Sequence, residues 1–420
     1  MTSRDDCLAR DARDPLAPLR DQFDLPAGKI YLDGNSLGVL PRTTAGRVAE
    51  VVKREWGEQL IESWNTAHWI ELPQRVGDKI ARLVGAAPGE LVAADSTSVN
   101  LFKVLSAALT MVRADTPQRR AIVSERGNFP TDLYIAEALA RERGFDLVLL
   151  DTPQQIGPRL ARGDVAVLML TQVDFKSGRL HDMAAESRAA HDAGAMVIWD
   201  LAHSAGALPV DLHAGGADFA VGCGYKYLNG GPGAPAFVWV HPRHAERFWQ
   251  PLAGWMGHAA PFEFDPAYRP APGIARYQCG TPAVLSLAAL DCGVDTLLAA
   301  EPLGGMPALR AKSLTLTDLF IDMVEERCAG HGLECITPRE HALRGSQVSF
   351  ARAEGAYAIV QALIARGVVG DFRAPDVMRF GFTPLYLRFV DVWDAVEHMR
   401  QVLESGQWQQ ARFNKKAAVT

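Results

Sequence analysis

The chain has 420 residues, enough for two domains or for one large domain with a smaller partner, and its hydrophobic content of 48% is typical of a globular protein with a real core. The formal net charge of −6 is mild and the basic residues are scattered, which argues against the basic face of a nucleic-acid-binding protein and against a basic membrane-surface helix. The expected partners are a small molecule and a second copy of the chain.

The N-terminal stretch MTSRDDCLARDARD is too charged for a signal peptide, and no run of about 18 apolar residues follows it. The six cysteines lie far apart without a CxxC pair, which fits free thiols in a reducing compartment better than disulfides or a zinc site. We expect a soluble cytoplasmic protein with no metal site that binds neither nucleic acid nor a membrane.

Between about residues 90 and 240, short apolar runs alternate with helical stretches. Strands are expected in ELVAAD, AIVSE, DLVLLD, VAVLMLTQV, AMVIWD, DFAVGCG and AFVWV. Amphipathic helices are expected at 97–113 and 130–144, the second ending at Gly144. This alternation predicts an α/β layer structure with a mostly parallel central sheet flanked by helices.

The amino-acid composition changes in the second half of the chain. Residues 251–283 are rich in glycine, proline and aromatic residues, and they form too long a segment for a simple connector, so we expect a functional loop region. Helical periodicity returns at 309–330 and a small α+β unit closes the chain. We expect a large domain at 61–299 and a smaller α+β domain built from 1–60 and 300–420.

Polar residues stand at four predicted strand ends, and open α/β sheets bind ligands beyond the carboxyl ends of their strands. These residues are Ser96, Thr97 and Ser98, then Thr171, then Asp200 with His203, and then Tyr225 with Lys226. The hydroxyl residues at 96–98 begin a helix, where free backbone N–H groups favour a phosphate. An ordinary N-cap is the commoner role for such residues.

Lys226 lies in GCGYKYLNGGPG (222–233), among glycines and tyrosines and with no carboxylate inside the stretch. An unpaired ammonium that leaves water costs several kcal/mol, so this lysine needs a partner or a chemical role. One interpretation is a structural ion pair with Asp200. The other is a Schiff base with pyridoxal 5'-phosphate, with Asp200 on the pyridine nitrogen and the helix start at 97–98 on the phosphate.

Several blocks of sequence, in order, carry a resemblance to a known family. They are YLDGNSLG (31–38), TSVNLFK (97–103), FPTDLY (129–134), DLAH (200–203), GYKYLNGGPG (224–233), GWMGH (254–258), CGTP (279–282), RGSQVSF (344–350) and MRFGFTPLY (378–386). The chain resembles the kynureninase family, within the class V aminotransferase group of fold-type I pyridoxal-phosphate enzymes. Departures are small: Gly224 replaces a frequent Ser or Thr, Met256 replaces Phe, and VDFKSG (173–178) replaces VNYKTG.

The resemblance implies a role for each matched residue. Cofactor contacts are implied for Thr97, Ser98, Phe129, Asp132, Thr171, Asp200, His203, Tyr225, Lys226, Trp255 and Thr281. Some of the residues at the phosphate end are expected from a second subunit, which makes the protein a homodimer with composite active sites. Substrate contacts are implied for Arg379, which would grip the α-carboxylate with its planar fork, and for Ser36 and Trp64.

The implied reaction is the hydrolytic cleavage of the Cβ–Cγ bond of L-kynurenine, or of its 3-hydroxylated form, to anthranilate and L-alanine in tryptophan catabolism. Lys226 would move the α-proton, Asp200 would keep the ring nitrogen protonated and Tyr225 would shuttle a proton. Two rival functions stay open. A cysteine desulfurase would need a thiolate on a mobile loop, for which Cys279 is the one candidate, and a sensor would bind the cofactor without catalysis.

Overall fold

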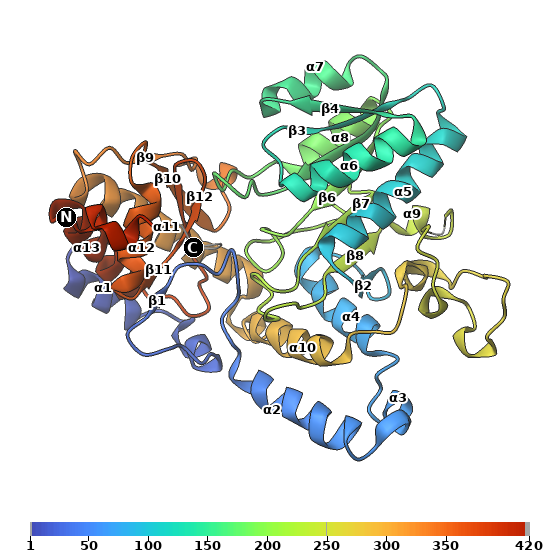
Figure 1. Cartoon of the computed structure of the whole chain (residues 1–420), viewed down its shortest axis with the longest axis horizontal. Helices are drawn as coiled ribbons and strands as arrows, with labels where there is room; N and C mark the ends of the chain where they lie inside the picture. The colour runs from blue at the N-terminus through green and yellow to red at the C-terminus, as the bar shows by residue number, and fades with distance from the viewer. Residues whose placement is uncertain (1, 249, 416–420) are drawn as a thin grey trace.

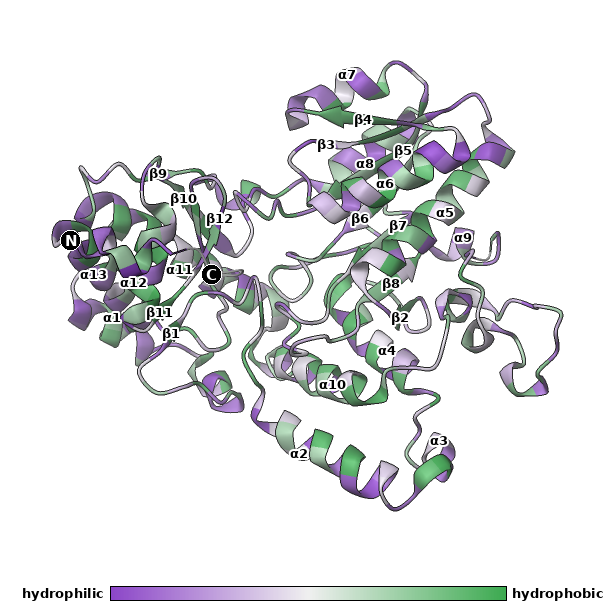
Figure 2. Cartoon of the chain, in the orientation of Figure 1, coloured by the Kyte–Doolittle hydropathy of each residue, from purple (hydrophilic) through white to green (hydrophobic). Residues whose placement is uncertain are grey.

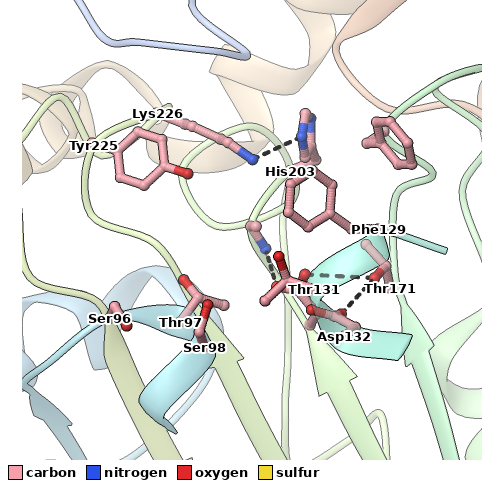
Figure 3. A pocket seen from close by; sticks show the side chains of 13 residues that line it. Ser96, Thr97, Ser98, Phe129, Thr131, Asp132, Thr171, His203, Tyr225 and Lys226 are labelled. Carbon is pink, nitrogen blue, oxygen red and sulfur yellow. Dashed lines mark hydrogen bonds between the residues drawn. The ribbon is translucent and has the colours of Figure 1, made fainter. Parts of the chain in front are cut away.

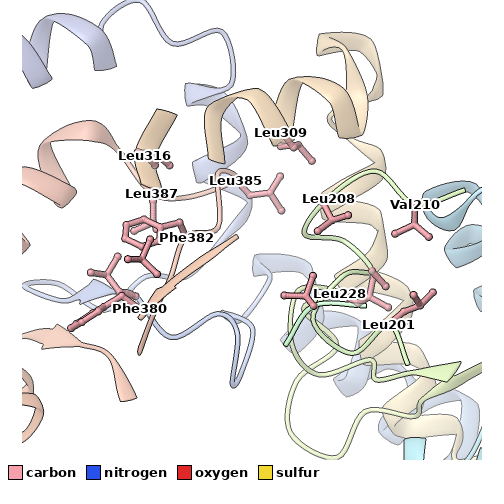
Figure 4. Packing of buried hydrophobic residues seen from close by; sticks show 14 of the residues in the cluster. Leu201, Leu208, Val210, Leu228, Leu309, Leu316, Phe380, Phe382, Leu385 and Leu387 are labelled. Atoms are coloured by element: carbon pink, nitrogen blue, oxygen red, sulfur yellow. The ribbon is translucent and has the colours of Figure 1, made fainter. Parts of the chain in front are cut away.

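The computed structural model describes residues 2–248 and 250–415, and it shows two lobes side by side (Figure 1). One lobe surrounds a seven-stranded sheet and the other a four-stranded sheet. A single hydrophobic cluster runs through both, from Leu201, Leu208 and Leu228 in the first lobe to Leu316 and Phe380 in the second (Figure 4). The two lobes therefore share a continuous core.

The seven-stranded sheet has the order β2-β8-β7-β6-β5-β3-β4. Its strands are β2 (Leu91–Ala93), β3 (Ala121–Glu125), β4 (Asp146–Leu150), β5 (Val165–Thr171), β6 (Met196–Asp200), β7 (Phe219–Gly222) and β8 (Phe237–Val240). Strands β3 to β7 pair in parallel, while β8 runs antiparallel to both β7 and β2. Each of the seven predicted runs contains one of these strands, so the predicted fold class is confirmed.

Helices cover both faces of this sheet because its strands are apolar on both sides. They are α4 (Leu72–Val84), α5 (Thr97–Asp115), α6 (Pro130–Arg143), α7 (Ile156–Leu160), α8 (Met183–Asp192) and α10 (Val284–Leu298). Helix α6 ends, as predicted, at Gly144, whose φ of 67° is the left-handed conformation that a residue without Cβ adopts most easily. Figure 2 shows hydrophobic strands such as β4 beneath helices with hydrophilic outer faces such as α7.

The smaller lobe contains the antiparallel sheet β12-β13-β10-β9. Its elements are β9 (Glu334–Cys335), β10 (Gln347–Ala351), β12 (Asp371–Arg373) and β13 (Val377–Gly381), with α1 (Arg4–Asp11), α11 (Gly305–Arg327), α12 (Ala356–Ala365) and α13 (Phe389–Glu404). Strand β1 (Ile30–Tyr31) pairs in parallel with β11 (Val368–Val369), so the N-terminal segment joins the C-terminal unit. The domain limits 61–299, 1–60 and 300–420 stay a prediction.

The remaining helical segments are short. They are α2 (Arg42–Glu50), which continues into a π-helical turn (Val51–Trp56), α3 (Ser63–Thr66) and α9 (Pro242–Ala245). The segment 251–283 contains three 3-10 turns and projects from the larger lobe, with the Phe262 and Phe264 side chains exposed (Figure 1). Among the described helices, none is long and apolar enough to cross a membrane.

Candidate active site

A cavity opens at the carboxyl edge of the seven-stranded sheet, where the sequence predicted a ligand site (Figure 3). The predicted residues that line it are Thr97, Ser98, Phe129, Asp132, Thr171, Asp200, His203, Tyr225 and Lys226. They come from the ends of β5, β6 and β7 and from the first turns of α5 and α6. The topology brings them together because strands β2, β5, β6 and β7 all point the same way.

Lys226 reaches this cavity from the loop after β7. It is half-buried rather than fully buried, and its Nζ lies 2.9 Å from His203 Nε2 (Figure 3). The hydrogen-bond partner of its amine is therefore a histidine and not Asp200. A simple Asp200–Lys226 ion pair, one of the two interpretations of the sequence, is not what the structure shows, because Asp200 acts on Lys226 through its charge and not through a hydrogen bond.

Asp200 and Asp132 face each other at the floor of the cavity, with the Thr171 hydroxyl 3.5 Å from each. Burial, together with the charge of Asp200, raises the pKa of Asp132 well above its ordinary value. Burial also raises the pKa of Asp200, against the opposing charge of Lys226. Two buried carboxyl groups at this distance favour a shared proton or a cationic ligand group between them.

At the start of α5, different hydroxyl residues are placed for the two roles that the sequence left open, the N-cap and the phosphate site. Ser96 is the N-cap, and its Oγ accepts from Val99 N at 3.3 Å. Thr97 and Ser98 are the first helical residues and line the cavity. Because the first N–H groups of a helix lack intrahelical partners, this helix end offers donors to an anion in the cavity.

Aromatic side chains close the cavity on two sides. Phe129, the residue before α6, is 44% exposed and packs edge-to-face on Phe175 at 5.4 Å between ring centroids. Tyr225 lies beside Lys226, with the amine 5.7 Å from the phenol ring centroid. Burial raises the pKa of the Tyr225 hydroxyl, so this group stays protonated at neutral pH and is suited to donate a proton.

Gly224, a departure from the usual pattern of the family, has a packing reason. A Cβ at this position would lie 2.2 Å from the carbonyl oxygen of Pro235 and about 3 Å from the Leu290 side chain. A Ser or Thr would therefore force the backbone apart directly before Tyr225 and Lys226. The glycine allows the lysine loop to lie close to the chain that follows it.

Arg379 and Ser36 lie outside the cavity lining, behind Phe175. The guanidinium of Arg379 is 1% exposed, and its Nη1 donates to the Phe175 carbonyl oxygen. The side chains of the smaller lobe already supply an anion to this arginine. Asp371 is its cross-strand neighbour in β12–β13 and accepts from both Nε and Nη2, while Ser36 Oγ donates to the same carboxylate at 2.7 Å.

Three predicted residues lie elsewhere in the chain. Trp64 and Trp255 pack on each other with ring centroids 6.4 Å apart, in a cluster with Trp69 and Phe262. Thr281 is exposed beside a separate cavity lined by Asp95 and Cys279. Within one copy of the chain, these residues do not join the cavity of Lys226.

Four residues around the site were missed by sequence reasoning. Asn128 accepts from Thr171 at 2.5 Å, Phe175 lines the cavity, Gln347 contacts His203, and Asp371 holds Arg379. Asn128 and Phe175 each lie within a few residues of a predicted site residue, so their position in the sequence was a usable signal. Gln347 lies 144 residues from His203, and no local pattern links the two.

The residues of the cavity fit pyridoxal 5'-phosphate. A buried carboxylate pair with raised pKa values suits a protonated ring nitrogen, and the start of α5 suits a phosphate. Phe129 offers an open aromatic face, and the Lys226 amine points into the same space (Figure 3). These are the groups that such a cofactor requires from a protein.

Solved structures share this fold at low sequence identity. A cysteine desulfurase from Thermococcus onnurineus NA1 is 18% identical, with a TM-score of 0.77 over 92% of this chain and 98% of its own. A mutant of C-DES with glycine covalently linked to its PLP cofactor is 17% identical, with a TM-score of 0.79 over 91% of this chain and 98% of its own. These likenesses establish the fold-type I architecture.

Curated relatives are far more similar. The kynureninase of Pseudomonas fluorescens is 56% identical over the full length of both chains, and that of Burkholderia pseudomallei strain K96243 is 54% identical over the same extent. The family model described as the kynureninase C-terminal domain matches residues 309–399, which contain Gln347, Asp371 and Arg379. The chain belongs to the kynureninase family.

Proposed function

We propose that the chain is a pyridoxal-phosphate-dependent hydrolase that cleaves the Cβ–Cγ bond of L-kynurenine to give anthranilate and L-alanine. Full-length identity of 54–56% to kynureninases supports this activity. The observation that carries it in the structure is the convergence of Lys226, the Asp132–Asp200 pair and the start of α5 on one cavity. This set serves a cofactor with a carbonyl, a ring nitrogen and a phosphate.

The bound cofactor supplies an electron sink for the bonds at the substrate Cα. Asp200 would stabilise the positive charge on the ring nitrogen of the bound cofactor, and Ala202 N donates to its Oδ1 at 2.8 Å and so fixes the carboxylate. Thr171 holds both carboxyl groups of the cavity floor in place. Asp132 shares the proton of this pair when no cation is present, because two like charges this close raise the pKa of the group.

Lys226 Nζ takes the proton from the substrate Cα and returns one to the product. His203 is the neutral partner that orients this amine, since burial, with the charges of Lys226 and Arg379, lowers the pKa of its imidazole well below the usual range. Tyr225 keeps its proton at neutral pH and donates it to a developing negative charge during carbon–carbon cleavage. One water molecule enters at the γ-carbonyl, which balances the hydrolysis.

Arg379 and Ser36 bind the substrate α-carboxylate. Asp371 accepts from Nε and Nη2, and Ser36 Oγ also accepts from Nη2, while Nη1 donates to the carbonyl oxygen of Phe175, a residue that lines the cavity. Nη1 is therefore the group through which Arg379 would reach a ligand in the cavity. A substrate carboxylate beside Nη1 would replace the Phe175 carbonyl oxygen as the acceptor of the Nη1 hydrogen bond. Phe129, which lines the cavity, would pack on the flat cofactor. Trp64 packs on Trp255 and would help to enclose the aryl ring from the second subunit.

We propose a homodimer in which Trp255 and Thr281 complete the cavity of the other subunit. Both residues lie in the segment 251–283, and in their own chain neither lines the cavity of Lys226. Exposed apolar side chains lie in the same part of the chain's fold, where Trp56 and Leu285 line a hollow with Trp69, which packs against Trp64 and through it on Trp255. Large exposed apolar patches commonly mark protein–protein contacts.

Two further expectations belong to this proposal. The lobes correspond to a large domain at 61–299 and a smaller one at 1–60 and 300–420, supported by the β1–β11 pairing. The compartment is the cytoplasm, supported by the free state of the six cysteines.

The proposed function is tested by following anthranilate fluorescence after L-kynurenine is added to the holoprotein. Wild-type protein should release anthranilate and alanine in equal amounts, and Lys226→Ala should release neither. A matched assay with L-cysteine tests the desulfurase alternative by sulfide release. Cys279 lies beside Gln250, in the cavity of Thr281 and not in that of Lys226, so we expect no sulfide.

A further inference from the structure

Gln347 makes two side-chain contacts that no sequence pattern indicated. It is the first residue of β10 in the smaller lobe and is 1% exposed. Its Nε2 donates to the Phe175 carbonyl oxygen at 3.0 Å, and its Oε1 lies 3.1 Å from His203 Nδ1. It does not line the cavity, so it acts on the site through the residues it contacts, and His203 is the one of these that contacts Lys226.

These contacts fix the direction of the amide. A backbone carbonyl only accepts, so the amide nitrogen must face Phe175 and the amide oxygen must face His203. An amide oxygen also only accepts, so His203 Nδ1 must carry the proton. The other ring nitrogen, Nε2, then has a lone pair, and this lone pair faces the Lys226 amine at 2.9 Å.

We infer that Gln347 is a positioning residue that holds His203 as its Nδ1–H tautomer, so that His203 Nε2 accepts a hydrogen bond from Lys226 Nζ and aims the amine into the cavity. This inference rests on the proposed function for its kinetic consequence. The tautomer itself is a property of the chain alone. With the opposite tautomer, an N–H would face the amine N–H groups and the contact would be lost.

The Phe175 carbonyl oxygen connects the hydrogen bonds of Gln347 and His203 to Arg379, which lies behind the cavity. Phe175 O accepts from both Gln347 Nε2 and Arg379 Nη1. Gly178 lets the segment 173–178 lie close to Gln347, because a Cβ there would lie 2.8 Å from Gln347 Cγ, and Gly178 has a φ of 76°. If a ligand accepts the hydrogen bond of Arg379 Nη1, the Phe175 carbonyl oxygen still accepts from Gln347 Nε2. Gln347 then stays in place, and the histidine keeps its orientation.

The charges around His203 favour the neutral ring that this role requires. Lys226, Arg379 and Arg373 face it with positive charge, and burial acts in the same direction, so the pKa of the imidazole is lowered well below its usual range. The hydrogen bond with Gln347 acts the other way. A carboxylate in place of this amide would add a negative charge beside Nδ1 and raise the pKa of His203.

The first test is the tautomer in cofactor-free protein. Protein labelled with 15N-histidine is analysed by long-range 1H–15N correlation, with the His203 signals assigned by comparison with His203→Gln. We expect wild-type His203 to be the neutral Nδ1–H tautomer between pH 6 and 8, and Gln347→Leu to show a mixture or the Nε2–H form. An Nε2–H tautomer or a cationic ring in wild-type protein overturns the inference, whether or not the chain cleaves kynurenine.

The second test is kinetic, with two variants of the same residue. In Gln347→Leu we expect kcat to fall about 10- to 100-fold with little change in KM, because a wrong tautomer disables a positioned base more than it weakens binding. In Gln347→Glu, which keeps the size of the side chain, we expect the added negative charge to raise the pKa of His203, so that the inactivating protonation step in the pH profile of kcat/KM lies at higher pH than in wild-type protein. Equal kcat in wild type and Gln347→Leu, or an unchanged pH profile in Gln347→Glu, overturns the inference.

Gln361→Leu is the matched control. Gln361 lies in α12 and its Nε2 is buried without a partner among the described residues, so the same change removes a glutamine far from the cavity. We expect wild-type kinetics and the wild-type His203 signal. Loss of both in this control would assign the Gln347→Leu effect to general destabilisation of the smaller lobe.

Discussion

Arg379 and Asp371 form a buried two-pronged ion pair across strands β12 and β13. Nε of the arginine donates to Oδ1 of Asp371 at 2.7 Å and Nη2 donates to Oδ2. Both residues are 1% exposed. Burial opposes ionisation, but the hydrogen bonds and charge of Arg379 hold the pKa of Asp371 below its usual value. The arginine is therefore oriented before any ligand arrives, which would lower the entropy cost of the carboxylate contact that we propose for it.

The first prediction concerns this arginine. Arg379→Ala removes one member of a desolvated charged contact, which costs about 2 to 5 kcal/mol, or roughly 30-fold to several-thousand-fold in kcat/KM for L-kynurenine. Arg379→Lys should recover only part of the loss, since an ammonium cannot pair with Asp371 and a substrate carboxylate through separate edges. Anthranilate fluorescence measures both. A variant with full kcat/KM would place the carboxylate elsewhere and make Arg379 structural.

The second prediction is that the cofactor becomes attached to Lys226 and not to Lys103. Lys103 is the more deeply buried lysine, but Asp95, Asn100 and the Tyr277 carbonyl already accept from its amine. Lys226 meets a single neutral acceptor and points into the cavity. Borohydride reduction of the holoprotein followed by peptide mapping should find the pyridoxyl mass on Lys226. A label on Lys103 or on another lysine would contradict the assignment.

The parts of this site that sequence could predict are those encoded locally. An apolar strand that stops at Thr171 or Asp200 marks both the strand and its functional end, because parallel strands deliver their carboxyl ends to one edge. The anionic partner of Arg379 was missed although it lies only eight residues away. The stretch from Asp371 to Arg379 is a hairpin, and its turn at 374–376 was the available signal for a cross-strand pair.

Contacts between the lobes could not be predicted in the same way. The hydrogen bond between Gln347 and His203 depends on how two sheets sit relative to each other, and no local periodicity carries that information. Trp255 and Thr281 show a related limit. The resemblance implied that they serve the cofactor, yet a single chain holds them outside the cavity, so the role proposed for them requires a second copy.

The third prediction tests that second copy by mixing variants. Alone, Lys226→Ala should be inactive and Trp255→Ala should be weakly active. If Trp255 serves the other subunit, unfolding and refolding the two together at equal amounts should restore about a quarter of wild-type activity, because half of the dimers are mixed and each has one intact site. If both residues serve one site within a chain, no mixture exceeds the average of the two variants. Sedimentation of the wild type should show a dimer.

The fourth prediction concerns the carboxyl pair in cofactor-free protein. Folding raises the pKa of both Asp132 and Asp200, so the folded state binds more protons than the unfolded one above about pH 4 and stability falls as the pH rises through the folded pKa values. Asp132→Asn removes one of these groups and the repulsion on the other. The variant should lose less thermal stability than wild type between pH 5 and 8, measured by calorimetry. Equal slopes would contradict the prediction, and Asp192→Asn, an exposed change, is the control.

The fifth prediction concerns Asp218, whose hydrogen bonds stabilise the edge of the sheet opposite the cavity. Asp218 precedes β7 and accepts from His191 at 2.9 Å, from His244 at 2.7 Å, from Val197 N at 2.8 Å and from Arg243. Burial opposes its ionisation, but these donors hold the pKa of Asp218 far below its usual value. Such a group stabilises the folded protein at every pH above its unfolded pKa of about 4, and the stabilisation is lost as the pH falls toward the folded pKa.

Asp218→Asn should therefore destabilise the protein at pH 7 by about 2 to 4 kcal/mol, because it leaves buried donors opposite an amide nitrogen. The measurement is the urea midpoint of wild type and variant at fixed cofactor concentration. The difference between them should shrink as the pH falls below about 4, where the unfolded carboxylate becomes protonated and the wild-type protein loses its advantage over the amide. Since Asp218 lies at the amino ends of β6 and β7, kcat for folded protein should not change. A midpoint equal to wild type at pH 7 would show that the histidines and Arg243 find water or other acceptors, and that this cluster does not hold the sheet edge together.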